Sequence, residues 1–265
     1  MAYVATIGFF DGVHLGHRYL LTALREEAKK RGLRSAIITF SEHPQKVLQG
    51  ERKPLLTTYD ERMAMLKTMG VDEIFCFNFE LIHTLSAEAF EQLIHDRCGV
   101  EALLMGYDHH FGCPQSSIVN LQSSIEHLRL SERPGNQHIS STKIREALLK
   151  GEIVEANEML GYAYPLIGTV VHGKAMGRTI GFPTANIEVE ADKLIPAHGV
   201  YIAQWNGRKV LLNINNTIEM YVPQFDGDLY DQSVRVELIA RIRGEQHFDN
   251  LDQLKIQIKK DLLSL

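Results

Sequence analysis

The chain has 265 residues, of which 45% are hydrophobic and 23% are charged, and its formal net charge is −5 at pH 7. This length can bury one large core or two ordinary ones, whereas the negative charge excludes the basic field that nonspecific nucleic-acid binding requires. No apolar run reaches the length of a transmembrane helix, and no basic segment followed by an apolar core stands at the N-terminus. We therefore expect a globular protein with neither a nucleic-acid partner nor a membrane partner.

Cysteine usage indicates the cellular compartment. Cys76, Cys98 and Cys113 form no C-x-x-C pair and leave an odd count. This pattern is typical of free thiols in a reducing compartment, so we expect a cytoplasmic protein.

The stretch 8–17 follows a strand-like run over 2–7 and precedes a helix-like segment over 18–30. Turn glycines let backbone N–H groups approach a ligand, and a helix N-terminus adds partial positive charge, so this arrangement is typical of a phosphate site. The chain contains neither G-x-x-x-x-G-K-[ST] nor G-x-G-x-x-G, which excludes a Walker loop and the dinucleotide fingerprint. The distinctive feature is a pair of histidines three residues apart, His14 and His17.

Strand-like and helix-like runs alternate through the first half of the chain, which predicts a parallel α/β sheet. The predicted strands cover 4–7, 35–40, 73–77 and 102–105, and Thr58 is the expected N-cap of a helix. A parallel sheet binds ligands at the carboxyl ends of its strands. The opening turn, His43-Pro44 and the stretch 106–112 each follow a predicted strand, so we expect all three at one edge of the sheet.

A second phosphate-type element stands at 139–145, where Ser141 is the expected cap of a following helix. Its hydroxyl groups, its free N–H groups and Arg145 would face an anion. Taken alone, the S-S-T-x-x-R pattern is more often an ordinary capped helix. Together with the opening stretch, it becomes a candidate second clamp on a triphosphate.

The pattern changes after Met159. A short break at 161–165 precedes strands without regular helices between them, and the alternation over 234–243 is typical of a strand with one buried face. We therefore expect an antiparallel barrel, followed by a final helix with Asp249 as its N-cap. The predicted barrel strands cover 166–171, 200–205, 210–214, 218–222 and 234–242.

A segment at 173–186 in the barrel half is rich in glycines, cations and small polar groups. Its glycines let the backbone approach phosphates, and Lys174 and Arg178 supply positive charge. Thr184 and Asn186 place two neutral oxygens on the same side of an extended segment. These oxygens suit Mg²⁺, which takes few protein ligands beside substrate phosphates. By spacing alone, a glycine-rich loop that merely turns is an equally good interpretation.

Short strings stand in one order along the chain. They are G-x-F-D-G-V-H-x-G-H at 8–17, T-F-x-x-H-P at 39–44, G-Y-D-H-H-F-G at 106–112, I-S-S-T-x-I-R at 139–145, G-x-x-x-G-R-T-x-G-F-P-T-A-N at 173–186, P-x-x-G-V-Y at 196–201 and F-D-G-D-L-Y at 225–230. The first four resemble the adenylyltransferase module, and the rest the flavokinase module, of the prokaryotic bifunctional riboflavin kinase and FAD synthetase family. The presence of both modules in one chain is the specific feature of this resemblance.

The resemblance implies an α/β protein with two domains. Residues 1–160 would form a Rossmann-like nucleotidyltransferase domain with a parallel sheet, and residues 161–265 a flavokinase-type antiparallel β-barrel with a terminal helix. It also implies two reactions with ATP as co-substrate. Riboflavin and ATP give FMN and ADP in the second domain, and FMN and a further ATP give FAD and pyrophosphate in the first.

For adenylyl transfer, the resemblance implies that His14 and His17 hold the ATP phosphates and stabilise the transition state. Arg145, with Ser141 and Thr142, would hold the departing pyrophosphate. Either histidine alone is more simply interpreted as a helix-start residue bonded to its own turn. The other residues expected to bind nucleotide or flavin are Gly8, Phe10, Asp11, Gly12, His43, Pro44 and Asp108.

For riboflavin phosphorylation, the resemblance implies that Thr184 and Asn186 hold Mg²⁺ and that Glu219 is the general base. Without the resemblance, Glu219 would be interpreted as an outward-facing strand residue. The residues expected to bind the nucleotide phosphates are Gly173, Lys174, Gly177 and Arg178.

Two features depart from the family pattern. In the family, a longer stretch with a G-x-R-P-T-F type sequence usually precedes the glutamate, whereas this chain has only the short connection 213–217 there. The segment after Gly112 also lacks an arginine that the family often has. Either this kinase lacks part of its flavin lid, or flexible residues are missing from the sequence. The alternatives are an adenylyltransferase whose barrel binds flavin without kinase activity, a non-catalytic flavin or nucleotide sensor, and a different H-x-G-H nucleotidyltransferase such as a cytidylyltransferase.

Overall fold

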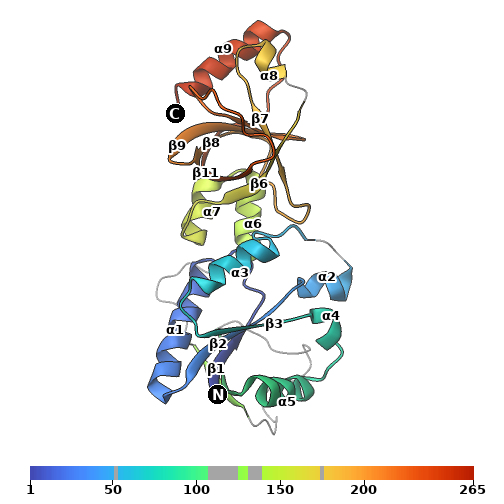
Figure 1. The fold of residues 1–265 in the computed structure, drawn as a ribbon, viewed down its shortest axis with the longest axis vertical. Helices are drawn as coiled ribbons and strands as arrows, with labels where there is room; N and C mark the ends of the chain where they lie inside the picture. Colours follow the sequence, from blue (N-terminus) through green and yellow to red (C-terminus); the bar gives the residue numbers. More distant parts are fainter. Residues whose placement is uncertain (51–52, 107–124, 131–138, 174–175) are drawn as a thin grey trace. The chain divides into compact units, whose positions relative to one another are not determined.

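The computed structural model describes residues 1–50, 53–106, 125–130, 139–173 and 176–265. The chain divides into two compact units, Met1–Ile139 and Ser140–Leu265, whose helices and strands are drawn in Figure 1. The first unit contains a parallel sheet and the second a closed antiparallel barrel. The predicted fold class, including the change of architecture along the chain, is confirmed.

The first unit is built around a five-stranded parallel sheet with the order β3-β2-β1-β4-β5. All four predicted strands are present, and the sequence prediction missed the edge strand β5, whose sequence EHLR contains no apolar run. The strands are β1 (Tyr3–Ile7), β2 (Arg34–Phe40), β3 (Glu73–Phe77), β4 (Val100–Met105) and β5 (Glu126–Arg129).

Helices cover both faces of this sheet (Figure 1). On one face, α1 (Leu15–Arg31) and α3 (Tyr59–Lys67) bury apolar side chains such as Leu24 and Leu66 against the strands. On the other face, α4 (Phe79–Ile82) and α5 (Ala87–Cys98) do the same, with Phe90 and Ile94 in the core. The unit therefore has three layers, and a further short helix, α2 (Pro44–Gln49), follows β2.

Local chemistry explains where these helices begin and end. Thr58 caps α3 as predicted, because its hydroxyl accepts the Glu61 N–H while the Glu61 carboxylate accepts the Thr58 N–H. α1 ends at Gly32, whose φ of 66° is left-handed and whose N–H bonds to carbonyls of the last turn. Local sequence therefore sets the first residue of α3 and the last residue of α1.

The strand order determines where a ligand site can form. β1 lies between β2 and β4, which is the point where the strand order reverses. Sheets of this kind bind ligands outside the carboxyl ends of the strands at that point. β1 ends at Ile7, so the stretch 8–17 leaves the sheet there. β4 ends at Met105, and the stretch that follows lies outside the described residues from 107 onward.

The second unit is a closed barrel with the strand order β10-β7-β6-β11-β8-β9. Side chains that point inward, such as Leu166, Tyr201 and Val236, are fully buried. The prediction missed β7, which was interpreted only as an extended part of the glycine-rich segment. The strands are β6 (Pro165–Val171), β7 (Ala185–Val189), β8 (Gly199–Trp205), β9 (Arg208–Ile214), β10 (Ile218–Tyr221) and β11 (Ser233–Arg243).

Helices α6 (Ser141–Lys150) and α7 (Ile153–Leu160) belong to the same unit as the barrel. The Asn157 side chain donates to the Leu238 carbonyl at 2.9 Å and accepts the Tyr164 N–H at 2.8 Å, which ties α7 to the barrel. A four-residue helix, α8 (Met176–Thr179), and α9 (Leu251–Leu262) complete the unit.

Two predicted helix caps are wrong by one residue. Ser140, not Ser141, caps α6, because its hydroxyl accepts the Lys143 N–H at 3.4 Å. Asn250, not Asp249, caps α9, because its side chain accepts the Gln253 N–H at 3.0 Å. In both pairs the neighbouring side chains have similar capping ability, so the local sequence did not distinguish them.

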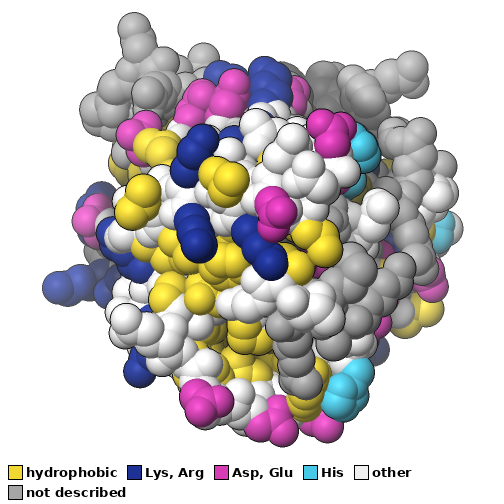
Figure 2. Space-filling view, turned by 90° about the horizontal axis from the view of Figure 1, so that it is seen from above, with side chains coloured by type: hydrophobic (Ala, Val, Ile, Leu, Met, Phe, Trp, Pro, Cys, Tyr) yellow, Lys and Arg dark blue, Asp and Glu magenta, His cyan; other side chains and the backbone are white. Residues whose placement is uncertain are grey.

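A largely buried ion pair joins α9 to β11. The Arg243 guanidinium donates to both Asp261 carboxylate oxygens, from Nε at 3.1 Å and from Nη2 at 2.8 Å. Gln257 donates to the same carboxylate at 2.8 Å. The outer side of α9 leaves Leu251 and Ile256 exposed, and Figure 2 shows hydrophobic and basic side chains side by side at this end of the unit.

Among the helices in the described part of the chain, none is both long enough and apolar enough to cross a membrane.

Asp261→Asn should destabilise the second unit by roughly 3 kcal/mol, because it leaves the Arg243 guanidinium largely buried without its counter-charge. The midpoint of thermal or urea unfolding measures this. Asp252→Asn makes the same change at an exposed position of α9 and should have little effect. Equal shifts for the two variants would contradict the role of the ion pair.

Candidate active sites

The stretch 8–17 forms a loop that leaves β1 and enters α1. Phe10, Gly12 and Val13 have positive φ angles of 59°, 79° and 36°, and the Val13 N–H donates to the Phe10 carbonyl at 3.1 Å. A left-handed backbone is strained for a β-branched residue such as Val13. The loop must therefore be held by contacts outside itself.

Asp11 supplies those contacts. Its buried carboxylate accepts the Leu56 N–H at 3.0 Å, the Thr57 N–H at 2.9 Å and the Thr57 hydroxyl at 3.0 Å. The Thr57 hydroxyl in turn accepts the Gly12 N–H at 3.0 Å. Phe10 is also buried, in the core on the α1 side of the sheet. Two of the predicted binding residues, Phe10 and Asp11, thus hold the loop through buried side chains.

His14 and His17 lie together at the N-terminus of α1. His14 is the N-cap, its Nδ1 accepts the His17 N–H at 3.3 Å, and the two rings stack with centroids 3.6 Å apart. A Cβ on Gly16 would lie 3.1 Å from the His14 ring, so the glycine leaves room for this stack. The first turn of α1 contains no acidic residue, which suits an anion at this helix end.

His17 is neutral near pH 7. Burial, and secondarily the neighbouring His14 ring, hold the pKa of His17 well below its usual range, because a charged imidazole would lose hydration there. Its Nδ1 is buried without a hydrogen-bond partner in the described part of the chain, and the Phe10 ring lies edge-on at 5.2 Å. A negatively charged ligand nearby would favour the protonated form.

His43 and Pro44 lie beside the same loop. His43 caps α2 by accepting the Gln45 N–H on Nδ1 at 3.1 Å, and Pro44 is the first residue of that helix. The His43 ring meets the Phe9 ring at a centroid distance of 4.6 Å. The structure thus brings the loops after β1 and β2 together. Asp108, from the loop after β4, lies outside the described residues.

The sequence prediction missed Arg62, which lies beneath this loop. Its guanidinium Cζ is 3.7 Å from the centroid of the Phe9 ring, and its Nη2 donates to the Phe40 carbonyl at 2.6 Å. The side chain is 0% exposed. Arginines on surface helices are mostly exposed, so nothing in the sequence indicated its burial.

Ser141, Thr142 and Arg145 lie in the first turns of α6. This helix belongs to the second unit, whereas His14 and His17 belong to the first. The two groups of residues predicted to bind one nucleotide therefore come from different units.

The barrel brings Asn186 and Glu219 together. They are direct partners in the antiparallel pairing of β7 with β10, so their side chains lie on the same face of the sheet. Thr184 directly precedes β7. The turn between β9 and β10 is tight, because Asn215 Oδ1 accepts the Thr217 N–H at 2.8 Å. The Thr217 hydroxyl lies 3.2 Å from Glu219 Oε1.

The glycine-rich segment packs against these same side chains. A Cβ on Gly173 would overlap the Asn186 side-chain amide. A Cβ on Gly177 would overlap the Phe182 carbonyl and lie 3.2 Å from the Thr184 hydroxyl. Both positions therefore require glycine. Arg178 falls on α8, and Lys174 lies outside the described residues.

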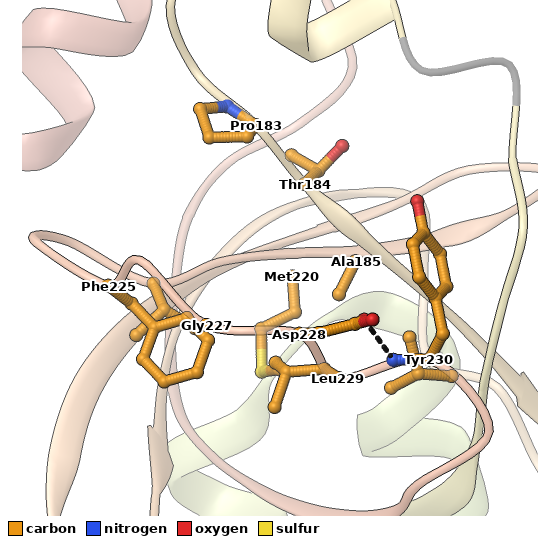
Figure 3. Close-up of a pocket in the computed structure, with 11 residues that line it drawn as sticks. Pro183, Thr184, Ala185, Met220, Phe225, Gly227, Asp228, Leu229 and Tyr230 are labelled. Carbon is orange, nitrogen blue, oxygen red and sulfur yellow. Dashed lines mark hydrogen bonds between the residues drawn. The ribbon is translucent and has the colours of Figure 1, made fainter.

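An open pocket with about 500 Å³ of empty space lies beside Thr184. In Figure 3 the Asp228 carboxylate turns toward the Tyr230 N–H, which it accepts at 2.9 Å. The sequence prediction gave no role to Tyr230 or to His172, whose rings stack with centroids 3.8 Å apart. His172 stands in no recognisable motif. The other lining residues are Val170, Pro183, Ala185, Met220, Val222, Phe225, Gly227 and Leu229.

The oxygen donors at the start of β7 and on β10 are of a kind that fits Mg²⁺. Within the described ranges, no group of three or more histidine, cysteine, aspartate or glutamate side chains could hold a metal ion. Thr184, Asn186 and Glu219 instead offer a hydroxyl, an amide oxygen and a carboxylate. Such oxygen donors suit Mg²⁺ where substrate phosphates and water complete the coordination.

Comparison with known proteins gives a match in each half of the chain. Residues 1–143 match the FAD synthetase family model, and residues 160–264 match the riboflavin kinase family model. Among solved structures, the chain is similar to one titled as a macrolide-efflux protein from Streptococcus pneumoniae. That structure is 30% identical with a TM-score of 0.85, and the match covers 98% of this chain and 92% of the other.

Curated relatives match over nearly the whole length. The bifunctional riboflavin kinase/FMN adenylyltransferase of Listeria monocytogenes is 34% identical, over 97% of this chain and 90% of the relative. The protein of the same name from Escherichia coli K12 is 33% identical, over 98% and 91%. That from Bacillus subtilis is 30% identical, over 97% and 90%. The chain therefore belongs to the family of bifunctional riboflavin kinase/FMN adenylyltransferases.

Proposed function

We propose that the two sites carry out two successive steps of FAD synthesis, with the residues described above in specific roles. As a family member, the chain phosphorylates riboflavin to FMN with ATP and then adenylylates FMN with a second ATP, giving FAD and pyrophosphate. The observation that carries this function is that both family models match one chain. The matches favour it over an adenylyltransferase with an inactive barrel and over a non-catalytic sensor.

The proposed catalytic modules are 1–160 and 161–265. The family models leave 144–159 unmatched between them, and this segment contains most of α6 and α7. These helices would connect the modules.

We also propose a cytoplasmic location, because Cys76 and Cys98 are free thiols, as suits a reducing compartment.

In adenylyl transfer, an oxygen of the FMN phosphate attacks the α-phosphorus of ATP, and the bond to the bridging oxygen of pyrophosphate breaks. The protein needs no covalent nucleophile, because it positions in-line partners and neutralises developing charge. Nδ1 of His14 accepts the His17 N–H, so the ring proton lies on Nε2 and can be donated to a phosphate oxygen. The N-terminus of α1 adds partial positive charge.

The departing pyrophosphate would be held by Ser141, Thr142 and Arg145. These residues combine hydroxyl groups, the N–H groups at the start of α6 and a guanidinium that can bind two oxygens at once.

In riboflavin phosphorylation, the ribityl hydroxyl attacks the γ-phosphorus and ADP leaves. Glu219 would orient that hydroxyl and accept its proton late in the reaction, because a carboxylate is a weak base toward an alcohol. Thr184 and Asn186 would hold Mg²⁺, which when bound neutralises charge on the transferring phosphate. Gly173 and Gly177, with Lys174 and Arg178, would enclose the nucleotide phosphates.

His14→Ala should lower FAD formation from FMN about 100-fold or more, while FMN formation from riboflavin continues. Incubation with riboflavin, ATP and Mg²⁺, followed by separation of the three flavins, measures both reactions. The wild-type chain should yield FAD, and its failure to convert either flavin would refute the proposed function. Equal loss of both reactions in folded His14→Ala protein would refute the role of His14.

Glu219→Gln should reduce riboflavin kinase turnover roughly 100-fold or more with little change in riboflavin affinity, because the amide cannot accept a proton. The same variant should still make FAD from supplied FMN. Glu188→Gln makes the same change at an exposed position of β7 and serves as the matched control. Unchanged turnover in Glu219→Gln would exclude this residue as the base.

ATP binding at the first site should strengthen as the pH falls from about 8 toward 6. In the free protein, burial lowers the pKa of His17. The ring is therefore neutral at any pH above about 6.5, the usual pKa of a histidine side chain. Bound phosphates raise that pKa, so binding takes up a proton and is favoured at lower pH.

The measurement is the pH dependence of the ATP dissociation constant in wild type and in His17→Asn. Titration of ATP itself, and ATP binding at the barrel, are common to both proteins. Only the difference between them reports His17, and identical pH dependence would contradict the proposed proton uptake.

A further inference from the structure

Arg62 is a buried charge whose hydrogen bonds are incomplete. It is among the largest fully buried side chains, at 0% exposure, and its Nε and Nη1 have no hydrogen-bond partner among the described residues. Burial lowers the pKa of the guanidinium, although the nearby Asp11 carboxylate opposes this. A methionine of similar length would avoid both the desolvation of a charge and the unpaired N–H groups. Stability alone therefore gives no reason for an arginine here.

The two shortest contacts of Arg62 lead toward the adenylyl site. Its guanidinium stacks on Phe9, at 3.7 Å, and its Nη2 bonds to the carbonyl of Phe40, the last residue of β2. The same Phe9 ring also contacts the His43 ring, at a centroid distance of 4.6 Å. The Arg62 side chain thus reaches from α3 to the end of β2 and to the loop that follows β1.

Asp11 ties the same loop to the same helix at a second point. Its carboxylate bonds to Leu56 and Thr57, immediately before Thr58, the N-cap of α3. Two attachments fix both the position and the rotation of the loop relative to α3. Asp11 holds the part near His14, and Arg62 holds Phe9.

We propose that Arg62 is a positioning residue for adenylyl transfer, which holds Phe9 against His43 and so shapes the seat of the flavin acceptor. The inference rests on the proposed function of the first site. The stacking needs a flat, delocalised cation, which the guanidinium provides and an ammonium does not. Arg62 acts through Phe9 and touches no reacting atom.

The test compares Arg62→Met and Arg62→Lys with wild type in FAD formation from FMN. Arg62→Met should raise the KM for FMN about tenfold or more, with a smaller change in the KM for ATP. Its unfolding midpoint should stay the same or rise, and its riboflavin kinase turnover should be unchanged. Arg62→Lys keeps the charge but loses the stacking, so it should also raise the KM for FMN.

Arg34→Met is the matched control. Arg34 stands at the other end of β2, is partly exposed and lies over the Tyr3 ring at 5.5 Å, so its loss should leave the KM for FMN unchanged. If Arg62→Met does not fold, Phe9→Leu replaces it, because that variant removes the ring on which Arg62 acts. Combined with Arg62→Lys, Phe9→Leu should then give no further increase in KM.

An unchanged KM for FMN in folded Arg62→Met, or equal loss of both reactions with a lower unfolding midpoint, would overturn the proposal. Fully additive effects of Arg62→Lys and Phe9→Leu would also overturn it. Failure of the proposed function would appear separately, as an inactive wild type or an active His14→Ala. The two failures are therefore distinguishable.

Discussion

The hydrogen bonds between Asp11 and the Leu56–Thr57 backbone are the constraint on which the first site depends. They join segments 45 residues apart, so they depend on the folded arrangement of the sheet and α3. The left-handed residues of the loop, including Val13, are strained without them. The stacked histidines therefore owe their geometry to the folded sheet as much as to the local G-x-F-D-G-V-H-x-G-H sequence.

The two units prepare for phosphate chemistry by different means. In the first, the proposed phosphate site combines a helix N-terminus with two imidazoles, placed where the strand order reverses. In the second, oxygen donors come from neighbouring antiparallel strands, and glycines allow the backbone to close on them. Neither unit offers a covalent nucleophile in its proposed role. Both instead fix their functional groups to backbone that the fold makes rigid.

The sequence allowed prediction of features that depend on local pattern. Apolar runs identified most strands, and the rule that parallel strands end at one edge placed 8–17 beside His43-Pro44 correctly. The sequence prediction missed β5 because EHLR contains no apolar run. It missed β7 because this short strand directly continues the glycine-rich segment. The partners of Asp11 and the burial of Arg62 depend on contacts between segments distant in sequence. Those contacts leave no periodic pattern, so only the structure reveals them.

The tight turn between β9 and β10 determines on which face of the barrel wall the Glu219 side chain lies. Glu219 lies two residues beyond Thr217, and its neighbours Ile218 and Met220 are buried in the barrel. Strand side chains alternate between faces, so a shift of one position would exchange the carboxylate for one of those apolar groups. A change in the length of this connection therefore keeps an acidic side chain opposite Asn186 only where the pairing register with β7 is preserved. Whether the loop length is odd or even, rather than its sequence, decides on which side of the barrel wall this acidic side chain lies.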